Sequence, residues 1–157
     1  MFRDGPIDGL VLEPLKQYSD QRGWLVELFR DDDLGATNRP VMAYVSMTLP
    51  GVARGPHEHR EQADRFCILG PSSFKLYLWD NRTGSSTYRN RQCLVAGEEN
   101  PLSIVIPPGV AHAYKNVGDQ PGVVYNLPDQ LYAGWQRKQP VDEVRYEDDP
   151  ETPFVLD

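Results

Sequence analysis

The chain has 157 residues, of which 39% are hydrophobic and 25% are charged, and this balance excludes an intrinsically disordered protein. Sixteen basic and 23 acidic residues give a net charge of −7, so the basic face of a nucleic-acid-binding protein is not expected. No apolar run approaches the roughly 18 residues that a membrane-spanning helix needs, so no membrane partner is expected either.

The length predicts a single domain over residues 1–157 with a core of its own. Residues 141–157 hold seven acidic residues and one arginine, and we interpret them as an acidic, solvated tail. The first residues show no apolar segment typical of a secretory signal. Two cysteines, Cys67 and Cys93, are too few for a disulfide framework, so the sequence predicts a cytoplasmic protein with reduced thiols.

Short apolar segments rich in β-branched and aromatic residues follow one another along the chain, and 13 glycines and 14 prolines separate them. They predict strands at Ile7–Leu12, Trp24–Phe29, Val41–Met47, Arg65–Leu69, Phe74–Trp79, Gln92–Val95, Leu102–Ile106 and Gly122–Leu127. In the fifth of these, Phe74, Leu76 and Leu78 fall on one face and Lys75 and Tyr77 on the other.

No segment of 12 or more residues shows the period of an amphipathic helix. About eight short strands in one domain predict an all-β sandwich or barrel, and a jelly roll is a natural member of that class. The last part of the chain, Leu131–Asp157, has no clear strand pattern. We expect it to form irregular or edge structure packed on the barrel.

The three histidines of the chain fall in two short motifs. His57 and His59 form an H-x-H pair, which in a strand places both rings on one face, and Asp64 follows five residues later. His112 lies in a second, distant motif, Pro107-x-Gly-x2-His112-x3-Asn. Nitrogen and oxygen donors in this pattern make a plausible metal set.

The two motifs resemble the signature motifs of the cupin superfamily, G-x5-H-x-H-x3-4-E-x6-G and P-x-G-x2-H-x3-N. The first matches except that Asp64 stands where Glu is usual and the last gap is five residues. The resemblance implies a cupin fold, which is a double-stranded β-helix or jelly-roll barrel. For a metal the motifs are only suggestive, because many cupins bind none.

A narrower resemblance covers residues from about 7 to 132 and points to the dTDP-4-dehydrorhamnose 3,5-epimerase family. It is carried by Asp20-x-Arg22-Gly23-x3-Glu27, Arg54-Gly55-x-His57, Asp80-x-Arg82, Pro108-Gly109-x-Ala111-His112 and Val124-Tyr125. The family implies a metal-free jelly-roll homodimer without cofactor. It implies an epimerase or keto-sugar isomerase that acts on a nucleotide-diphosphate 4-keto-6-deoxy sugar in deoxysugar or polysaccharide biosynthesis.

The same resemblance implies roles for individual residues. His57 would be the general base that removes a proton next to the ketone, and Tyr125 would donate a proton from the opposite face. The substrate-contacting positions would be Arg22, Glu27, Arg54 and His112. Because a diphosphate is well bound by arginine, Arg82 is a further substrate-binding candidate beside Arg22 and Arg54. Tyr114 and Tyr132 are the fallback acids.

The chain also departs from the family at the site. The family has a catalytic lysine after a Gln-Ala pair, where this chain has Asp64, and Arg65, His112 or a metal ion would have to replace its positive charge. The family's C-terminal aspartate, which pairs with the base, has no certain match among Asp142, Asp148 and Asp157.

Two alternative functions therefore stay open at the level of sequence. One is a metal-dependent cupin enzyme in which His57, His59, Asp64 and His112 hold a divalent ion. The other is a non-catalytic cupin that binds a sugar.

Overall fold

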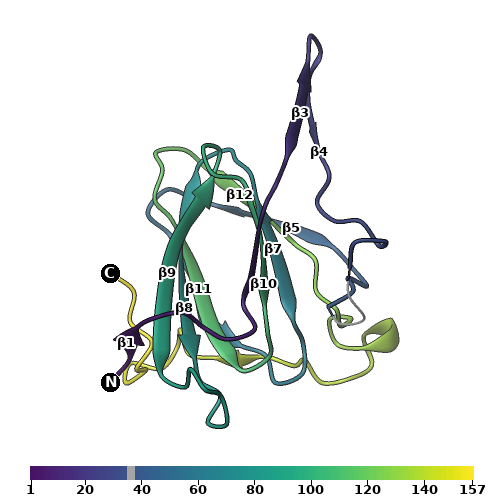
Figure 1. Ribbon diagram of the computed structural model, residues 1–157. Helices are drawn as coiled ribbons and strands as arrows, with labels where there is room; N and C mark the ends of the chain where they lie inside the picture. The colour runs from purple at the N-terminus through teal and green to yellow at the C-terminus, as the bar shows by residue number, and fades with distance from the viewer. Residues whose placement is uncertain (35–37) are drawn as a thin grey trace.

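A computed structural model, which describes residues 1–34 and 38–157, shows two β-sheets that face each other (Figure 1). The six-stranded sheet has the order β1 (Arg3–Asp4), β9 (Asn90–Gly97), β8 (Ser73–Asp80), β11 (Val110–Asn116), β6 (Ala53–Glu58) and β13 (Val144–Arg145). The five-stranded sheet has the order β2 (Val11–Pro14), β10 (Leu102–Ile106), β7 (Asp64–Ile68), β12 (Gly122–Asn126) and β5 (Tyr44–Thr48). All pairings except β1–β9 are antiparallel.

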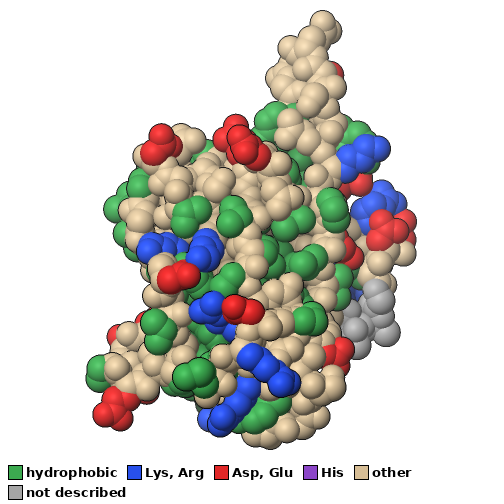
Figure 2. All heavy atoms as spheres, turned by 60° about the vertical axis from the view of Figure 1, so that its left-hand side comes forward, with side chains coloured by type: hydrophobic (Ala, Val, Ile, Leu, Met, Phe, Trp, Pro, Cys, Tyr) green, Lys and Arg blue, Asp and Glu red, His purple; other side chains and the backbone are tan. Residues whose placement is uncertain are grey.

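A separate hairpin projects from this body. It consists of β3 (Gln17–Asp20) and β4 (Gly23–Val26), which pair with each other only, and it stands out above the body in Figures 1 and 2. The single helical element among the described residues is the short 3-10 turn η1 (Trp135–Arg137). No helix in the described part of the chain is long and apolar enough to cross a membrane.

The main hydrophobic core fills the space between the two sheets. Strand β8 contributes Phe74, Leu76 and Leu78, as its alternation predicts, and the opposing sheet contributes Phe66 and Ile104. All five of these side chains are at most 2% exposed. Because successive side chains of a strand point to opposite faces, the remaining residues of these strands face outward.

The outward faces are also partly covered, which explains the continuous buried runs in β7 and β8. Tyr77 and Trp79 of β8 pack under the C-terminal segment, where Phe154 is 3% exposed. Cys67 of β7 packs under the chain that leads into and out of the hairpin, against Leu15 and Val26 among others.

The C-terminal segment is therefore packed on the barrel, as expected for Leu131–Asp157. This corrects the interpretation of residues 141–157 as a tail that is solvated along its length. The ring of Phe154 lies 5.4 Å from that of Phe2, 5.5 Å from Trp79 and 4.6 Å from Tyr146. Strand β13 of the same segment pairs with β6. Its acidic side chains remain largely exposed, so the charge pattern indicated polarity but not the apolar anchor.

The prediction of an all-β structure is confirmed, and each of the eight expected strands overlaps an observed one. Two strands that matter for function were not expected, β6 and β11. Both contain histidines, and β6 also contains a Gly-Pro pair, so neither forms an apolar run. Their place in the sheet comes from pairing with each other and, for β11, with β8.

Replacing Phe154 by alanine tests the anchoring of the C-terminal segment. Loss of a buried aromatic side chain is expected to lower the free energy of unfolding by about 3 kcal/mol. The matched control is Val155→Ala, because Val155 is the next residue and is 65% exposed. Urea unfolding of both variants measures the difference, and equal stabilities for the two would contradict the anchoring.

Candidate functional site

A cavity of about 1470 Å³ opens between the two sheets, and His57, His59 and Arg54 of the predicted site residues line it. Its walls include His57 from β6, His59 just after the end of that strand, Tyr44 from β5 and Asn126 from β12. The rim is formed by residues 128–137 and 139–143 together with the C-terminal strand. No histidine side chain is visible on the face shown in Figure 2.

Three histidines and one aspartate converge beside this cavity. His57 and His112 are directly paired across β6 and β11, and the ring of His59, just past the end of β6, lies 5.4 Å from that of His57. Asp64 begins β7 in the other sheet. One donor atom from each of the four residues lies within 4.8 Å of the others, so the sequence motifs do meet in space.

Gly55 is required at this point by the local backbone. Its φ of +83° lies in the left-handed region, and a Cβ atom there would come within 2.6 Å of the carbonyl oxygen of His112. The pairing of β6 with β11 shifts register between His112 and Tyr114, next to this glycine. The Arg-Gly-x-His pattern therefore reflects how closely the two histidine-bearing strands approach.

Asp64 is the buried centre of the cluster. Its side chain is 1% exposed, and its Oδ2 atom lies 3.2 Å from Nε2 of His59 and 3.2 Å from Nε2 of His112. The other carboxylate oxygen, Oδ1, accepts a hydrogen bond of 2.8 Å from Gln62. Both Nε2 atoms are at ion-pair distance from Asp64 Oδ2, but neither is aligned for a hydrogen bond, so Asp64 Oδ2 and His112 Nε2 have no hydrogen-bond partner among the described residues.

The hydrogen bonds of the Nδ1 atoms of His59 and His112 fix the tautomers of these two rings. Nδ1 of His112 lies 2.9 Å from the carbonyl oxygen of Val110, and Nδ1 of His59 donates to the carbonyl oxygen of Asp142. A carbonyl oxygen only accepts, so each Nδ1 carries a hydrogen and each Nε2 of a neutral ring presents a lone pair. Three lone pairs therefore point at one another, and a proton or a metal ion must lie among them.

The members of the cluster differ in their pKa values, and therefore in their charge. Burial lowers the pKa of His59, but the Asp64 carboxylate outweighs it and raises that pKa to about 9. Burial raises the pKa of Asp64, yet the two imidazoles bring it below its ordinary value. Burial and the neighbouring His112 lower the pKa of His57 to about 2, so His57 stays neutral.

The same atoms also fit a divalent transition metal. Tetrahedral zinc with bonds of about 2.0–2.1 Å places its ligand atoms about 3.3 Å apart, close to the 3.2 Å that separates Asp64 Oδ2 from each Nε2. The hydrogen bonds of His59, His112 and Asp64 to Asp142, Val110 and Gln62 are of the kind that orients metal ligands. His57 completes the set of four.

Of the predicted substrate contacts, Arg54 lines the cavity. Its Nε donates to Thr48 Oγ1 at 3.0 Å and its guanidinium donates to the carbonyl oxygen of Met47 at 2.9 Å. Both acceptors are neutral, so the positive charge of Arg54 is not neutralised within the described chain. His112 is 2% exposed and lies behind His57 rather than on the cavity wall.

The other predicted contacts lie elsewhere in this chain. Arg22 is at the tip of the projecting hairpin and pairs with Asp20 at 2.6 Å. Glu27 follows the hairpin and lies 3.5 Å from Arg30. Arg82 pairs with buried Asp80 at 2.8 Å in the turn between β8 and β9. None of the three lines the cavity, so their roles as substrate contacts stay predictions.

Tyr125 and Arg65 also lie outside the cavity. The strand alternation turns Tyr125 away from the core, and its side chain packs near Cys67 under the hairpin segment. Arg65 lies on the same outer face, where its guanidinium contacts Glu13 at 3.0 Å and Ser103 at 2.8 Å. The structure therefore does not bring either side chain to the imidazole cluster, whereas both fallback acids, Tyr114 and Tyr132, do line the cavity.

Sequence analysis missed three residues that the structure places at the site. Tyr44 and Asn126 carried no motif, and only their position in inward-facing strand register could have indicated them. Asp142 was one of three aspartates without an alignment. Its carboxylate accepts hydrogen bonds from the backbone N–H groups of residues 60, 61 and 62, at 3.0, 2.8 and 3.0 Å.

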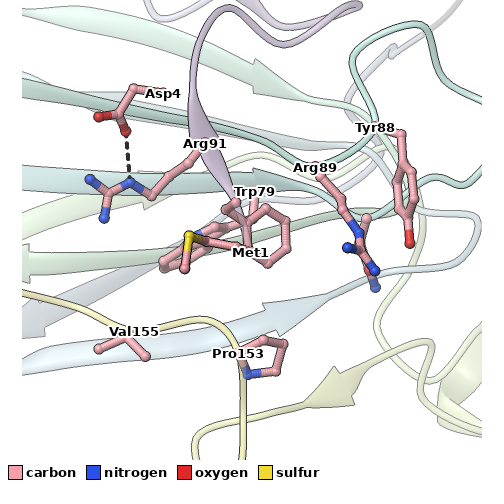
Figure 3. Close-up of a pocket in the computed structure, with 10 residues that line it drawn as sticks. Met1, Asp4, Trp79, Tyr88, Arg89, Arg91, Pro153 and Val155 are labelled. Carbon is pink, nitrogen blue, oxygen red and sulfur yellow. Dashed lines mark hydrogen bonds and ion pairs between the residues drawn. The ribbon is translucent and has the colours of Figure 1, made fainter.

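A second, smaller cavity of about 440 Å³ lies on the outer face of the six-stranded sheet (Figure 3). Trp79, Tyr88 and Arg89 line it, and Arg91 in its wall pairs with Asp4 at 3.0 Å. It contains no histidine and lies apart from the cluster around Asp64. We therefore take the larger cavity as the candidate active site.

Comparison with known proteins gives a consistent assignment. The family model described as dTDP-4-dehydrorhamnose 3,5-epimerase matches residues 4–149. A probable low-salt glycan biosynthesis epimerase from Haloferax volcanii is 40% identical, over 80% of this chain and 81% of that protein.

Solved structures agree with the fold. A dTDP sugar isomerase from Desulfovibrio desulfuricans superposes with a TM-score of 0.83 at 23% identity, covering 95% of this chain and 91% of its own. A 3,5-epimerase from Legionella pneumophila, solved in complex with dTDP-4-keto-L-rhamnose, gives 0.72 at 27% identity and covers 82% and 71%. The predicted double-stranded β-helix, or jelly-roll cupin barrel, is thereby confirmed.

Replacing Asp142 tests whether the C-terminal segment holds the loop that follows His59. Partial burial raises the pKa of Asp142, but three backbone donors bring it below the ordinary value. The ionised Asp142 therefore stabilises the loop at any pH above the ordinary pKa of a carboxyl group, and this stabilisation is lost as the pH falls and the carboxylate is protonated. Asp142→Ala is expected to speed amide hydrogen exchange at residues 60–62 by roughly tenfold or more. Asp148→Ala, an exposed neighbour, is the control. Unchanged protection in Asp142→Ala would contradict the role.

Proposed function

The chain belongs to the dTDP-4-dehydrorhamnose 3,5-epimerase family and is a nucleotide-sugar epimerase of glycan biosynthesis, and from this premise we propose that His57 is its general base. The observation that carries the proposal is the position of His57. It is the histidine of the cluster that combines a place on the cavity wall with a neutral ring held against His112. A neutral imidazole can accept a proton, whereas a protonated His59 cannot.

The proposed substrate is a nucleotide-diphosphate 4-keto-6-deoxy sugar. The related Legionella epimerase was solved with dTDP-4-keto-L-rhamnose, a molecule of this class. The cavity is large enough for an extended ligand, and Arg54 offers an unneutralised guanidinium on its wall. A planar guanidinium binds phosphate oxygens in pairs, so we assign the diphosphate to Arg54.

The proposed reaction begins with removal of a proton from a carbon next to the ketone. The C–H bond breaks, the proton passes to the imidazole of His57, and the electron pair moves to the ketone oxygen to give an enolate. Return of a proton to the opposite face of the carbon inverts its configuration. Epimerases of this family generally work without a cofactor, and we propose the same for this chain.

A divalent metal is the second candidate, and one observation favours it. Asp64 Oδ2 and His112 Nε2 are buried, face each other at 3.2 Å and lack an aligned hydrogen bond. When bound by His57, His59, Asp64 and His112, a metal ion would act as a Lewis acid toward a carbonyl oxygen. In the metal-free account, a positively charged His59 at 3.2 Å compensates the Asp64 carboxylate.

We also propose a homodimer. The hairpin exposes Tyr18, Trp24 and Leu25, and the end strand β5 exposes Val45 and Met47 on its outward face. These side chains are 48–61% exposed in one chain. Large apolar surface on a projecting arm and on a sheet edge is typical of an interface with another copy. The partner's cavity would then be the place where Arg22 and Glu27 of the hairpin contact substrate.

We also propose a single domain and a cytoplasmic location. Residues 1–157 form one domain, because the C-terminal segment completes a sheet through β13 and packs Phe154 on it. Both cysteines are free thiols, which supports a cytoplasmic location.

Deuterium exchange tests the epimerase directly. Chelator-treated protein is incubated in D2O with dTDP-4-keto-6-deoxyglucose, and the carbons on either side of the ketone are followed by NMR and mass spectrometry. Deuterium is expected to enter at one or both carbons, because each turnover passes through an enolate. His57→Ala is expected to slow this exchange by about 100-fold or more.

The outcomes separate the candidate functions. Exchange at both carbons indicates a 3,5-epimerase, and exchange at one carbon a mono-epimerase or ketoisomerase. Exchange that requires a restored, stoichiometric metal favours the metal-dependent enzyme. Bound nucleotide sugar without exchange under either condition would contradict catalysis and favour a sugar-binding protein.

Sedimentation equilibrium tests the dimer. The wild-type protein is expected to show the mass of two chains, and Trp24→Glu is expected to weaken association by tenfold or more, since a charge would be buried at the interface. Val95→Glu is the matched control, because Val95 is 50% exposed on the six-stranded sheet. A monomeric wild type, or equal weakening by both variants, would contradict this assembly.

A further inference from the structure

Inversion of a carbon centre needs a proton donor on the face opposite the base, and the structure leaves that donor to be identified. This inference rests on the proposed epimerase function with His57 as base. His57 projects from β6 of the six-stranded sheet. The donor is therefore sought on the five-stranded sheet, which forms the other wall of the cavity.

The tyrosines of the cavity differ in their availability. Tyr114 lies on β11, the strand next to His57, and its hydroxyl is already bonded to Ser46 at 2.8 Å. Tyr132 follows β12, lies on the rim of the cavity and is 55% exposed. Tyr125 faces the opposite side of its sheet. Tyr44, which is 46% exposed, is the tyrosine that lines the cavity from a strand of the facing sheet.

Tyr44 is held by a buried amide. Its Cα is the direct cross-strand partner of Asn126, and the Nδ2 of Asn126 donates a hydrogen bond to the phenol oxygen of Tyr44. Asn126 is 4% exposed, and its Oδ1 has no hydrogen-bond partner among the described residues. Because the phenol oxygen accepts from Asn126, the hydrogen of Tyr44 is not used in that bond and can be donated into the cavity.

We propose that Tyr44 is the proton donor of the epimerase and that Asn126 is its positioning residue. The bond from Asn126 strengthens when the phenol loses its proton, since a phenolate is a better acceptor than a phenol. Asn126 therefore stabilises the state that forms during proton transfer. Partial burial and the nearby Asp64 carboxylate raise the pKa of Tyr44, which keeps it protonated before the transfer.

The protons balance over one turnover. The substrate C–H proton passes to His57, which becomes an imidazolium, and the carbon–carbonyl unit becomes an enolate. The enolate carbon then takes the O–H proton of Tyr44 on its other face, which leaves a phenolate hydrogen-bonded to Asn126. Loss of a proton from His57 to solvent and gain of one by Tyr44 restore the enzyme, with no oxidant or reductant.

Tyr44→Phe separates abstraction from inversion. Without the donor, His57 can still remove the substrate proton and return a solvent deuteron to the same face. In D2O with dTDP-4-keto-6-deoxyglucose, this variant is expected to keep exchanging deuterium with retention of configuration. Its rate of epimer formation is expected to fall by about 100-fold or more. Asn126→Ala is expected to show the same split with a smaller loss.

Two comparisons decide the result. Tyr125→Phe makes the same chemical change on the outer face of the sheet and is expected to keep exchange and inversion together. The inference is overturned if Tyr44→Phe forms epimer at the wild-type rate, if a folded Tyr44→Phe protein loses exchange and inversion equally, or if Tyr125→Phe shows the split instead. A wild-type protein that neither exchanges nor epimerises would overturn the proposed function itself, which is a different outcome.

Discussion

One buried carboxylate organises the site. Asp64 lies between His59 and His112, with its Oδ2 atom 3.2 Å from each Nε2. A carboxylate that is 1% exposed is costly unless positive charge compensates it, so the cluster must hold a proton or a cation at this point. The resulting pair keeps His59 charged, and the third ring, His57, remains neutral beside the open cavity.

The two sheets provide the geometry for this arrangement. Direct pairing of His57 with His112 places two rings side by side, and the start of β7 brings Asp64 across from the other sheet. The same division gives the cavity two chemically different walls. One wall carries the histidines, and the facing wall carries Tyr44 with its partner Asn126. A reaction that moves protons to and from opposite faces of a carbon fits between them.

Sequence analysis succeeded where residue pattern alone determines structure. Alternation in β8 predicted its inward side chains, and the H-x-H spacing with a distant histidine predicted the cluster. It did not find strands β6 and β11, since their glycine, proline and histidine residues serve close approach and chemistry rather than an apolar face. Phe154 was hidden in an acidic segment, where charge dominates the composition.

The direction of individual side chains was beyond the sequence for a physical reason. A shift of one residue in a strand turns a side chain to the opposite face of the sheet. The family resemblance gave the position of Tyr125 in the chain but not the face of the sheet to which its side chain points. The structure turns it outward and turns Asn126 inward. The sequence also could not predict whether Arg22 and Glu27 reach a cavity, because that depends on where the hairpin lies in an assembled protein.

The most direct test of this account is the protonation state of the three imidazoles in chelator-treated protein. Long-range ¹H–¹⁵N NMR at neutral pH reports it for each ring nitrogen. The account predicts a doubly protonated His59, a neutral His57, and a His59 that becomes neutral when Asp64→Asn removes the carboxylate. A neutral His59 in the wild-type protein, or a charged His57, would contradict the central role given to Asp64.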